Sequence, residues 1–98
     1  MGNVRSGRDI DSALRKKGFH RETKGDHFYY HYFSLAEERT SIKTKISHGI
    51  GGGTIGAPLI SAMSRQLHLS KQQFLDFIDC AITEEQYRTI LREQGLAV

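Results

Sequence analysis

Hydrophobic residues recur at helical spacing near the start of the chain, then alternate with polar residues, and later return to helical spacing. Ile10, Ala13 and Leu14 form one apolar stripe, which predicts a helix over residues 9 to 17. Gly18 follows at the position where a left-handed C-cap would end that helix.

Three strands are predicted next. Residues 27 to 33 are an unbroken run of aromatic residues and histidines, and residues 40 to 47 alternate isoleucine or threonine with serine or lysine. A weaker strand signal covers residues 19 to 22. Because the polar segment 34 to 39 is short enough to join antiparallel neighbours, we expect a three-stranded meander over residues 19 to 47.

Helical patterns return after a glycine-rich segment. Residues 49 to 56 contain five glycines among eight residues, which predicts a flexible connector, and Pro58 suits the first turn of a helix that continues to Leu69. Two further helices are signalled by the capping boxes Ser70 with Gln73 and Thr83 with Gln86.

This order of elements predicts an α+β fold with an α-β-β-β-α core and additional C-terminal helices. A chain of 98 residues fits one hydrophobic core, so we expect a single domain over residues 1 to 98. Its core is assigned to residues 9 to 69, and residues 70 to 98 are a helical extension.

The amino-acid composition indicates which classes of partner and which cell compartment to expect. The net charge of +3 and the pI of about 9.2 favour an anionic partner, and the first 24 residues hold seven Lys or Arg against three Asp or Glu. Cys80 is the single cysteine, which excludes an intrachain disulfide and favours the cytoplasm. No secretory signal or membrane span is indicated, so no membrane role is expected.

Several short motifs resemble one known family. LRKKGF at residues 14 to 19 ends the first helix in a Gly-Phe pair, and Gly25-Asp26-His27 precedes the aromatic strand. TSIKTKISHG at residues 40 to 49 is similar to a third strand with a histidine near its end, here His48. In this order, the motifs resemble the HicA-like toxin ribonucleases.

The resemblance implies a double-stranded-RNA-binding-like fold over residues 9 to 69. It also implies that the chain cleaves messenger RNA as a toxin and that a HicB-like antitoxin neutralises it. His27 is the implied catalytic residue, and His48 is a secondary candidate. The glycine segment lacks the lysines often found in the family before the second helix, and residues 70 to 98 extend beyond small family members.

The chemistry of a metal-free cleavage fits a histidine. RNA cleavage moves a proton off the ribose 2′-hydroxyl or onto the leaving oxygen, and an imidazole with an ordinary pKa of about 6.5 can do either. Lys43 and Lys45 share one face of the next strand, where a cation would hold the scissile phosphate.

Strand alternation also divides the aromatic residues. We expect Phe28, Tyr30 and Tyr32 to pack under the helices, which leaves Tyr29 and Phe33 to contact RNA. No cofactor or metal is expected, because residues four apart on a strand, such as His27 and His31, lie about 13 Å apart at roughly 3.3 Å per residue.

Two alternatives remain open at this point. In one, the chain is a non-catalytic double-stranded-RNA-binding module whose Arg15, Lys16, Lys43 and Lys45 contact phosphates. In the other, it is a protein-interaction domain that docks another chain by a sheet edge or by its last helix. That last helix is also a possible contact between two copies of the chain.

Overall fold

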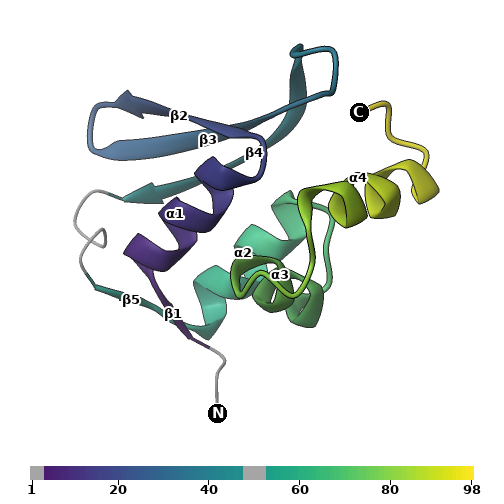
Figure 1. The fold of residues 1–98 in the computed structure, drawn as a ribbon. Coiled ribbons are helices and arrows are strands. Elements are labelled where there is room, and N and C mark those ends of the chain that lie inside the picture. Colours follow the sequence, from purple (N-terminus) through teal and green to yellow (C-terminus); the bar gives the residue numbers. More distant parts are fainter. Residues whose placement is uncertain (1–3, 48–52) are drawn as a thin grey trace.

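The computed structural model describes residues 4 to 47 and 53 to 98, and this part of the chain holds four helices, one three-stranded sheet and a short pair of strands (Figure 1). The fold is therefore of the α+β class, as predicted. In chain order the elements are β1 (Arg5–Ser6), α1 (Gly7–Lys16), β2 (Phe19–Lys24), β3 (His27–Phe33), β4 (Arg39–Ser47), β5 (Thr54–Ile55), α2 (Ala57–Gln66), α3 (Lys71–Ile78) and α4 (Glu84–Glu93).

The strands β2, β3 and β4 form an antiparallel sheet in that order, so the predicted meander is confirmed. β3 has the predicted bounds, whereas β2 continues to Lys24, two residues beyond the predicted strand. A two-residue turn joins β2 to β3, and Gly25 there has a φ of 61°, which a glycine adopts without steric cost.

A second pairing joins β1 to β5 in antiparallel register, with Arg5 opposite Ile55 and Ser6 opposite Thr54. The sequence predicted no strand at either place, because two residues are too few to display alternation. The pairing lies directly before α1 and close before α2, so it holds the starts of these two helices together (Figure 1).

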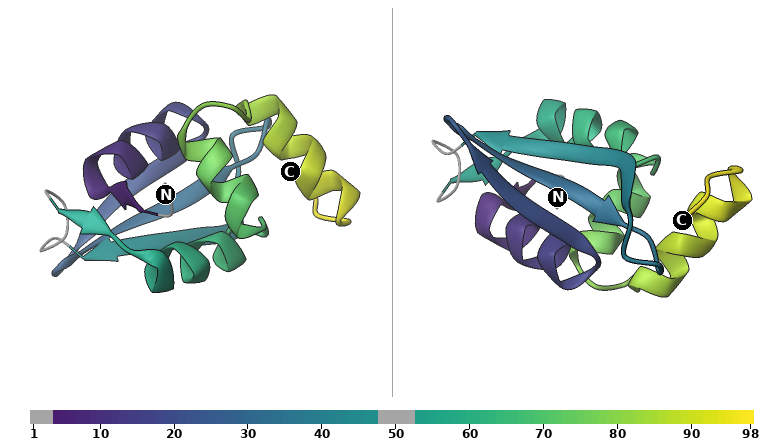
Figure 2. Two further views of the ribbon diagram at one scale, coloured as in Figure 1. Left: turned by 90° about the horizontal axis from the view of Figure 1, so that it is seen from below. Right: turned by 90° about the horizontal axis from the view of Figure 1, so that it is seen from above.

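The helices lie on one side of the three-stranded sheet and leave its other side open (Figure 2). Side chains on the inward face reach the helices: the Tyr30 hydroxyl donates a hydrogen bond to Asp11 of α1 over 2.6 Å, and the Thr44 hydroxyl bonds Gln66 of α2, also over 2.6 Å. Tyr30 and Tyr32 are fully buried and Phe28 packs against the core, which confirms the predicted division of the aromatic strand.

Both predicted capping boxes are present. The Ser70 side chain accepts a bond from the Gln73 N–H at the start of α3, and Thr83 does the same for Gln86 at the start of α4. In turn, the Oε1 atom of each glutamine accepts a hydrogen bond from the backbone N–H of its N-cap residue. The capping-box motifs therefore predicted the starts of α3 and α4 correctly.

The C-terminal helices are part of the core. Four rings from four elements form one aromatic cluster, in which Phe77 of α3 lies 4.7 Å from Tyr87 of α4 and Tyr87 lies 5.3 Å from Tyr32 of β3, measured between ring centroids. Phe19 of β2 completes the cluster, 5.0 Å from Tyr32. Residues 70 to 98 thus pack on the helical side and contribute to the same core as residues 9 to 69.

The segment between α1 and β2 is tightly packed. Gly18 has a φ of 93°, and a Cβ atom at this position would lie 2.8 Å from the Tyr32 ring and 2.5 Å from a carboxylate oxygen of Glu84. Only glycine combines this backbone conformation with this approach. The Gly-Phe pair therefore fixes where the first helix ends and the sheet begins.

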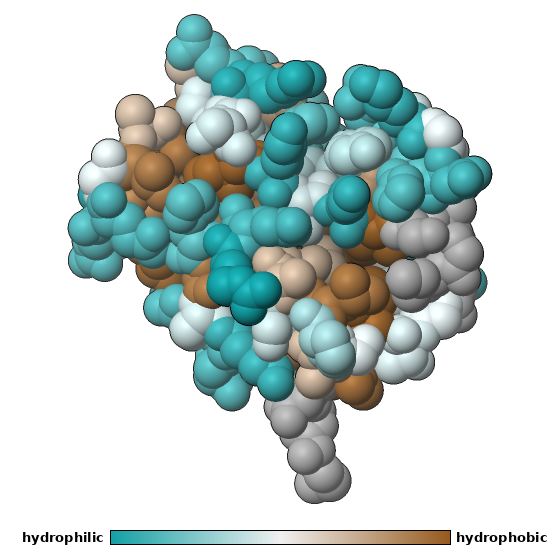
Figure 3. Space-filling view, turned by 180° about the vertical axis from the view of Figure 1, so that it is seen from behind, coloured by the Kyte–Doolittle hydropathy of each residue, from teal (hydrophilic) through white to brown (hydrophobic). Residues whose placement is uncertain are grey.

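Seen from behind, hydrophobic side chains gather in separate areas with hydrophilic side chains between them (Figure 3). Among the described residues, the exposed large apolar side chains are Val4, Leu35 and Leu59. In the part of the chain that the structure describes, no helix has the length and apolar character needed to cross a membrane.

Candidate nucleic-acid interface

The open face of the sheet carries alternate residues of β3. Because Tyr30 and Tyr32 point inward, the intervening side chains project to the opposite side. Their rings follow one another along the strand: the ring centroids of His27 and Tyr29 are 6.1 Å apart, and those of Tyr29 and His31 are 6.5 Å apart with an interplanar angle of 18°. The result is a row of planar rings on the side of the sheet opposite the helices.

The lysines of β4 lie on this same face. Lys45 is directly opposite Tyr29 and Lys43 is directly opposite His31 in the β3–β4 register, and both lysines are exposed. Side chains opposite one another in an antiparallel pair share a face, so both ammonium groups stand beside the row of rings. The sequence alone did not establish this relation between the lysines and His27.

His27 occupies the end of the row and is half-buried. Lys24 of β2 and Ser47 of β4 are its cross-strand partners, and Lys45 is its diagonal neighbour at about 7 Å. A phosphate group bound between Lys45 and Lys24 would therefore lie next to the imidazole. This position suits a proton transfer to or from a ribose oxygen.

Two more histidines lie on the face, and the sequence analysis assigned them no role. His31 is only 8% exposed, and its Nε2 lies 3.3 Å from Oε1 of Glu22. His20 is paired with His31 across the strands and stacks on Phe33, with 3.8 Å between ring centroids. The alternation that places His27 on the outward face also places His31 there, so the position of His31 was predictable from the sequence. The position of His20 could be found only from the register between β2 and β3.

Arg15 and Lys16 are on a different surface. Both lie on exposed positions of α1, on the helical side of the sheet, and Arg15 forms an ion pair with Asp11 over 3.4 Å. The structure therefore separates these two cations from Lys43 and Lys45 by the thickness of the sheet (Figure 2). One short segment of RNA cannot contact all four in the same way.

His48, the secondary catalytic candidate, lies outside the described residues, as does most of the predicted glycine connector. The catalytic role of His48 therefore stays a prediction from the sequence.

A hollow of about 440 Å³ lies at the edge of β4, next to the row of rings. β4 is the last strand of the three-stranded sheet, so the hollow lies at the sheet margin. Its lining contains hydroxyl, amide and ammonium groups and one aromatic ring, from Tyr29, Ser41, Lys43, Thr44, Lys45 and Gln66.

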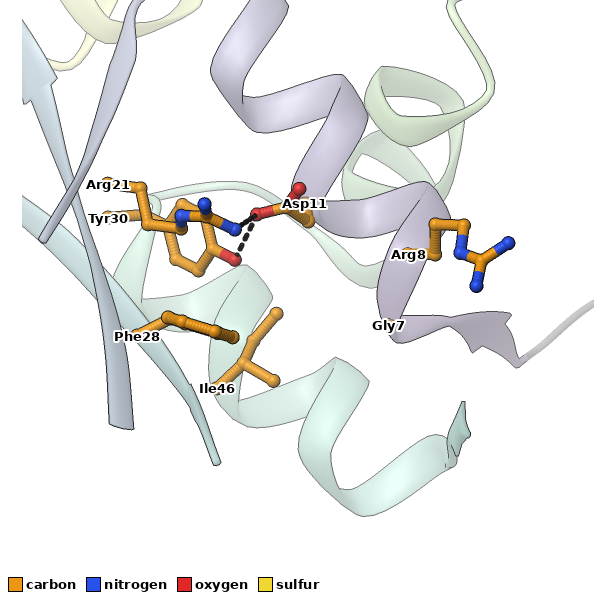
Figure 4. A pocket seen from close by; sticks show the side chains of 7 residues that line it. All are labelled: Gly7, Arg8, Asp11, Arg21, Phe28, Tyr30 and Ile46. Carbon is orange, nitrogen blue, oxygen red and sulfur yellow. Dashed lines mark hydrogen bonds and ion pairs between the residues drawn. The ribbon is translucent and has the colours of Figure 1, made fainter. Parts of the chain in front are cut away.

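A smaller cavity of about 120 Å³ lies between α1 and the inward face of the sheet (Figure 4). There Oδ1 of Asp11 accepts hydrogen bonds from the Tyr30 hydroxyl and from Arg21, whose guanidinium lies 4.7 Å above the Phe28 ring. Burial, together with the nearby Asp11 carboxylate, raises the pKa of Tyr30. These contacts connect α1 to β2 and β3, so the residues around this cavity have a structural role in joining the helix to the sheet.

No family model, curated protein or solved structure matches the chain. Among the described residues, no three His, Cys, Asp or Glu side chains come together in a way that would hold a metal ion. The open sheet face, with its rings, histidines and lysines, is therefore the candidate site.

Proposed function

We propose that the chain is a metal-independent endoribonuclease of the HicA-like toxin type, which cleaves messenger RNA on the open face of its sheet. In this proposal His27 is the general acid or base. The observation that carries it is that His27, Tyr29, Lys43 and Lys45 lie on one face of the sheet, which none of the described helices covers (Figure 2).

Each of these groups has a chemical task. Attack by the ribose 2′-oxygen on phosphorus requires a base for the hydroxyl proton, and departure of the 5′-oxygen requires an acid. An imidazole performs either transfer near neutral pH. An ammonium group such as that of Lys45 offsets the charge that develops on the phosphate oxygens, and the Tyr29 ring holds an unpaired base.

The order α1, β2, β3, β4 and α2 supports the finer fold assignment, because it is the element order of a double-stranded-RNA-binding-like core. A HicB-like antitoxin is the partner that this proposal implies. An adjacent reading frame that encodes a small antitoxin-like protein, and whose product restores growth on coexpression, is the expected genetic finding.

The direct test is cleavage of a labelled single-stranded RNA by the purified chain, followed on a gel in the presence of EDTA. The wild-type chain should cleave in EDTA, and His27→Ala should lower the rate by about a hundredfold or more, the usual scale for losing a general acid or base. An unaltered thermal unfolding curve is required, so that loss of activity is not loss of fold.

Two histidine variants provide matched comparisons. His68→Asn removes an exposed histidine that lies between α2 and α3, and asparagine tolerates the positive φ of 62° there, so cleavage should be unchanged. His31→Ala tests the second imidazole on the open face. Loss of cleavage in His31→Ala but not in His27→Ala would transfer the catalytic role to His31 with its partner Glu22.

A second candidate function is RNA binding without cleavage. The rings of His27 and Tyr29, with the His20–Phe33 stack near them, are favourable for stacking unpaired bases. This function predicts that the wild-type chain retains labelled single-stranded RNA in a salt-dependent manner and leaves it intact.

A further inference from the structure

The hollow at the edge of β4 has the size of a small-ligand site. Its volume of about 440 Å³ falls in the lower part of the range of about 300 to 1,000 Å³ that small-molecule sites occupy. A single nucleotide is a ligand of this class, whereas a nucleic-acid duplex is far too wide to enter.

The lining matches the parts of a nucleotide. Lys43 and Lys45 supply two ammonium groups, and none of the described residues that line the hollow carries a carboxylate, so an anionic ligand is favoured. Tyr29 supplies a half-buried aromatic ring on which a planar base can stack. Phosphate and base are thus both provided for within one space.

Gln66 adds a group able to distinguish bases. It is the last residue of α2, and its Oε1 accepts a hydrogen bond of 2.6 Å from the hydroxyl of Thr44, a residue that is only 2% exposed. A hydroxyl donates to the oxygen of an amide, so this contact orients the side chain. The other end of the amide, Nε2, keeps its two N–H donors, and Gln66 is one of the residues that line the hollow.

We infer that this hollow binds one nucleotide of a single-stranded RNA and that Gln66 makes it prefer uridine to cytidine. The two pyrimidines have nearly the same shape but differ in their hydrogen-bonding groups: uracil has an oxygen acceptor at position 4 and an N–H donor at position 3, whereas cytosine has an amino donor at position 4 and an acceptor at position 3. In this proposal an amide N–H of Gln66 meets position 4 of the base, where it pairs with the uracil oxygen and opposes the cytosine amino group. The inference rests on the proposed function, because it takes RNA to be the ligand of this face.

The test compares binding of fluorescein-labelled hexamers of uridine and of cytidine, both 2′-O-methylated so that no 2′-hydroxyl is available for cleavage. Fluorescence anisotropy with the full wild-type chain should give about threefold to tenfold tighter binding of the uridine hexamer, as expected for one hydrogen bond gained. Equal affinities would overturn the inference.

Gln66→Glu is the decisive variant. The carboxylate still accepts the bond from Thr44, but it replaces the N–H donors with an acceptor that suits the amino group of cytosine. The added charge weakens both complexes, so the readout is the ratio of the two affinities, which should reverse in favour of cytidine. An unchanged ratio would remove Gln66 from base selection.

Failure of this inference is distinct from failure of the proposed function. A chain that cleaves RNA but binds both hexamers equally lacks the uridine-selective site and remains a nuclease. A chain that prefers the uridine hexamer but never cleaves unmodified RNA has the nucleotide site and is a binding module.

Discussion

Lys17 lies against the end of α3, where its ammonium group donates a hydrogen bond to the backbone carbonyl of Phe77. A second bond of 2.9 Å reaches the carbonyl of Ile82, and the ammonium stands 4.6 Å from the centroid of the Phe77 ring. The last carbonyls of a helix lack partners within it and carry partial negative charge. Lys17, which directly follows α1, therefore caps the C-terminal end of α3. Its charged side chain is largely buried there, since the residue is only 8% exposed.

Lys17→Met should destabilise the fold by about 2 kcal/mol, because it leaves two partly buried carbonyls without their charged donor. For a domain of this size the midpoint of thermal unfolding should fall by roughly 8 to 16 °C. Lys16→Met removes the neighbouring, exposed lysine and should stay within about 0.5 kcal/mol of the wild type. Equal unfolding midpoints for the two variants would contradict the capping role.

Gly18→Ala and Gly95→Ala form a pair that separates backbone strain from steric contact. Both glycines have positive φ, of 93° and 86°, but a Cβ atom at Gly95 meets nothing within 4 Å, while one at Gly18 meets the buried Tyr32 ring. Gly95→Ala should cost about 1 kcal/mol and Gly18→Ala about 3 kcal/mol or more. Urea unfolding followed by circular dichroism measures both, and a smaller cost at Gly18 would refute the close packing there.

The ion pair between Arg5 and Asp79 should make stability depend on pH. The hydrogen bond from Arg5 lowers the pKa of Asp79, so the stabilisation is present above the ordinary aspartate pKa of about 3.9 and is lost as pH falls through the lowered value. Because the carboxylate is 47% exposed, the effect should stay below about 1 kcal/mol. Asp79→Asn should destabilise the chain at pH 7, by an amount that shrinks below about pH 4 and in 1 M salt. A difference that is constant across pH would rule the pairing out.

Charge removal on the two sides of the sheet should affect RNA binding differently. Lys43→Gln with Lys45→Gln should flatten the dependence of log affinity on log salt by about 1.4 for single-stranded RNA, at roughly 0.7 per phosphate contact. Arg15→Gln with Lys16→Gln removes the same charge from α1 and should leave the slope nearly unaltered. The reverse pattern would place the RNA on the helical side of the sheet. A lower slope in both double variants would favour the double-stranded-RNA-binding alternative, in which all four cations contact phosphates.

Local patterns predicted most of the elements, and the reason is visible in individual residues. The Ser70 and Thr83 capping boxes are formed by contacts within four residues of each other, so the sequence contains all the information they need. The bounds of β3 follow equally from its own aromatic run. The pairing of Arg5 with Ile55 joins residues 50 positions apart, so no local pattern in the sequence could predict it.

The candidate site was predictable only in part for the same reason. Alternation separated Tyr29 from the buried Tyr30, but it could not establish whether the lysines of the next strand share the face of His27. That relation depends on strand register, which also places His31 between His20 of β2 and Lys43 of β4. The bond between Thr44 and Gln66 depends on where α2 crosses the sheet.

The aromatic cluster also has a consequence for synthesis of the chain. Phe19 and Tyr32 emerge from the ribosome early, but their ring partner Tyr87 and the fully buried Leu91 belong to α4. A nascent chain that stops before α4 leaves apolar rings exposed on its helical side, and such intermediates are prone to aggregation. Completion of the core therefore waits for the synthesis of α4, which finishes the packing under the sheet that carries the lysines and histidines.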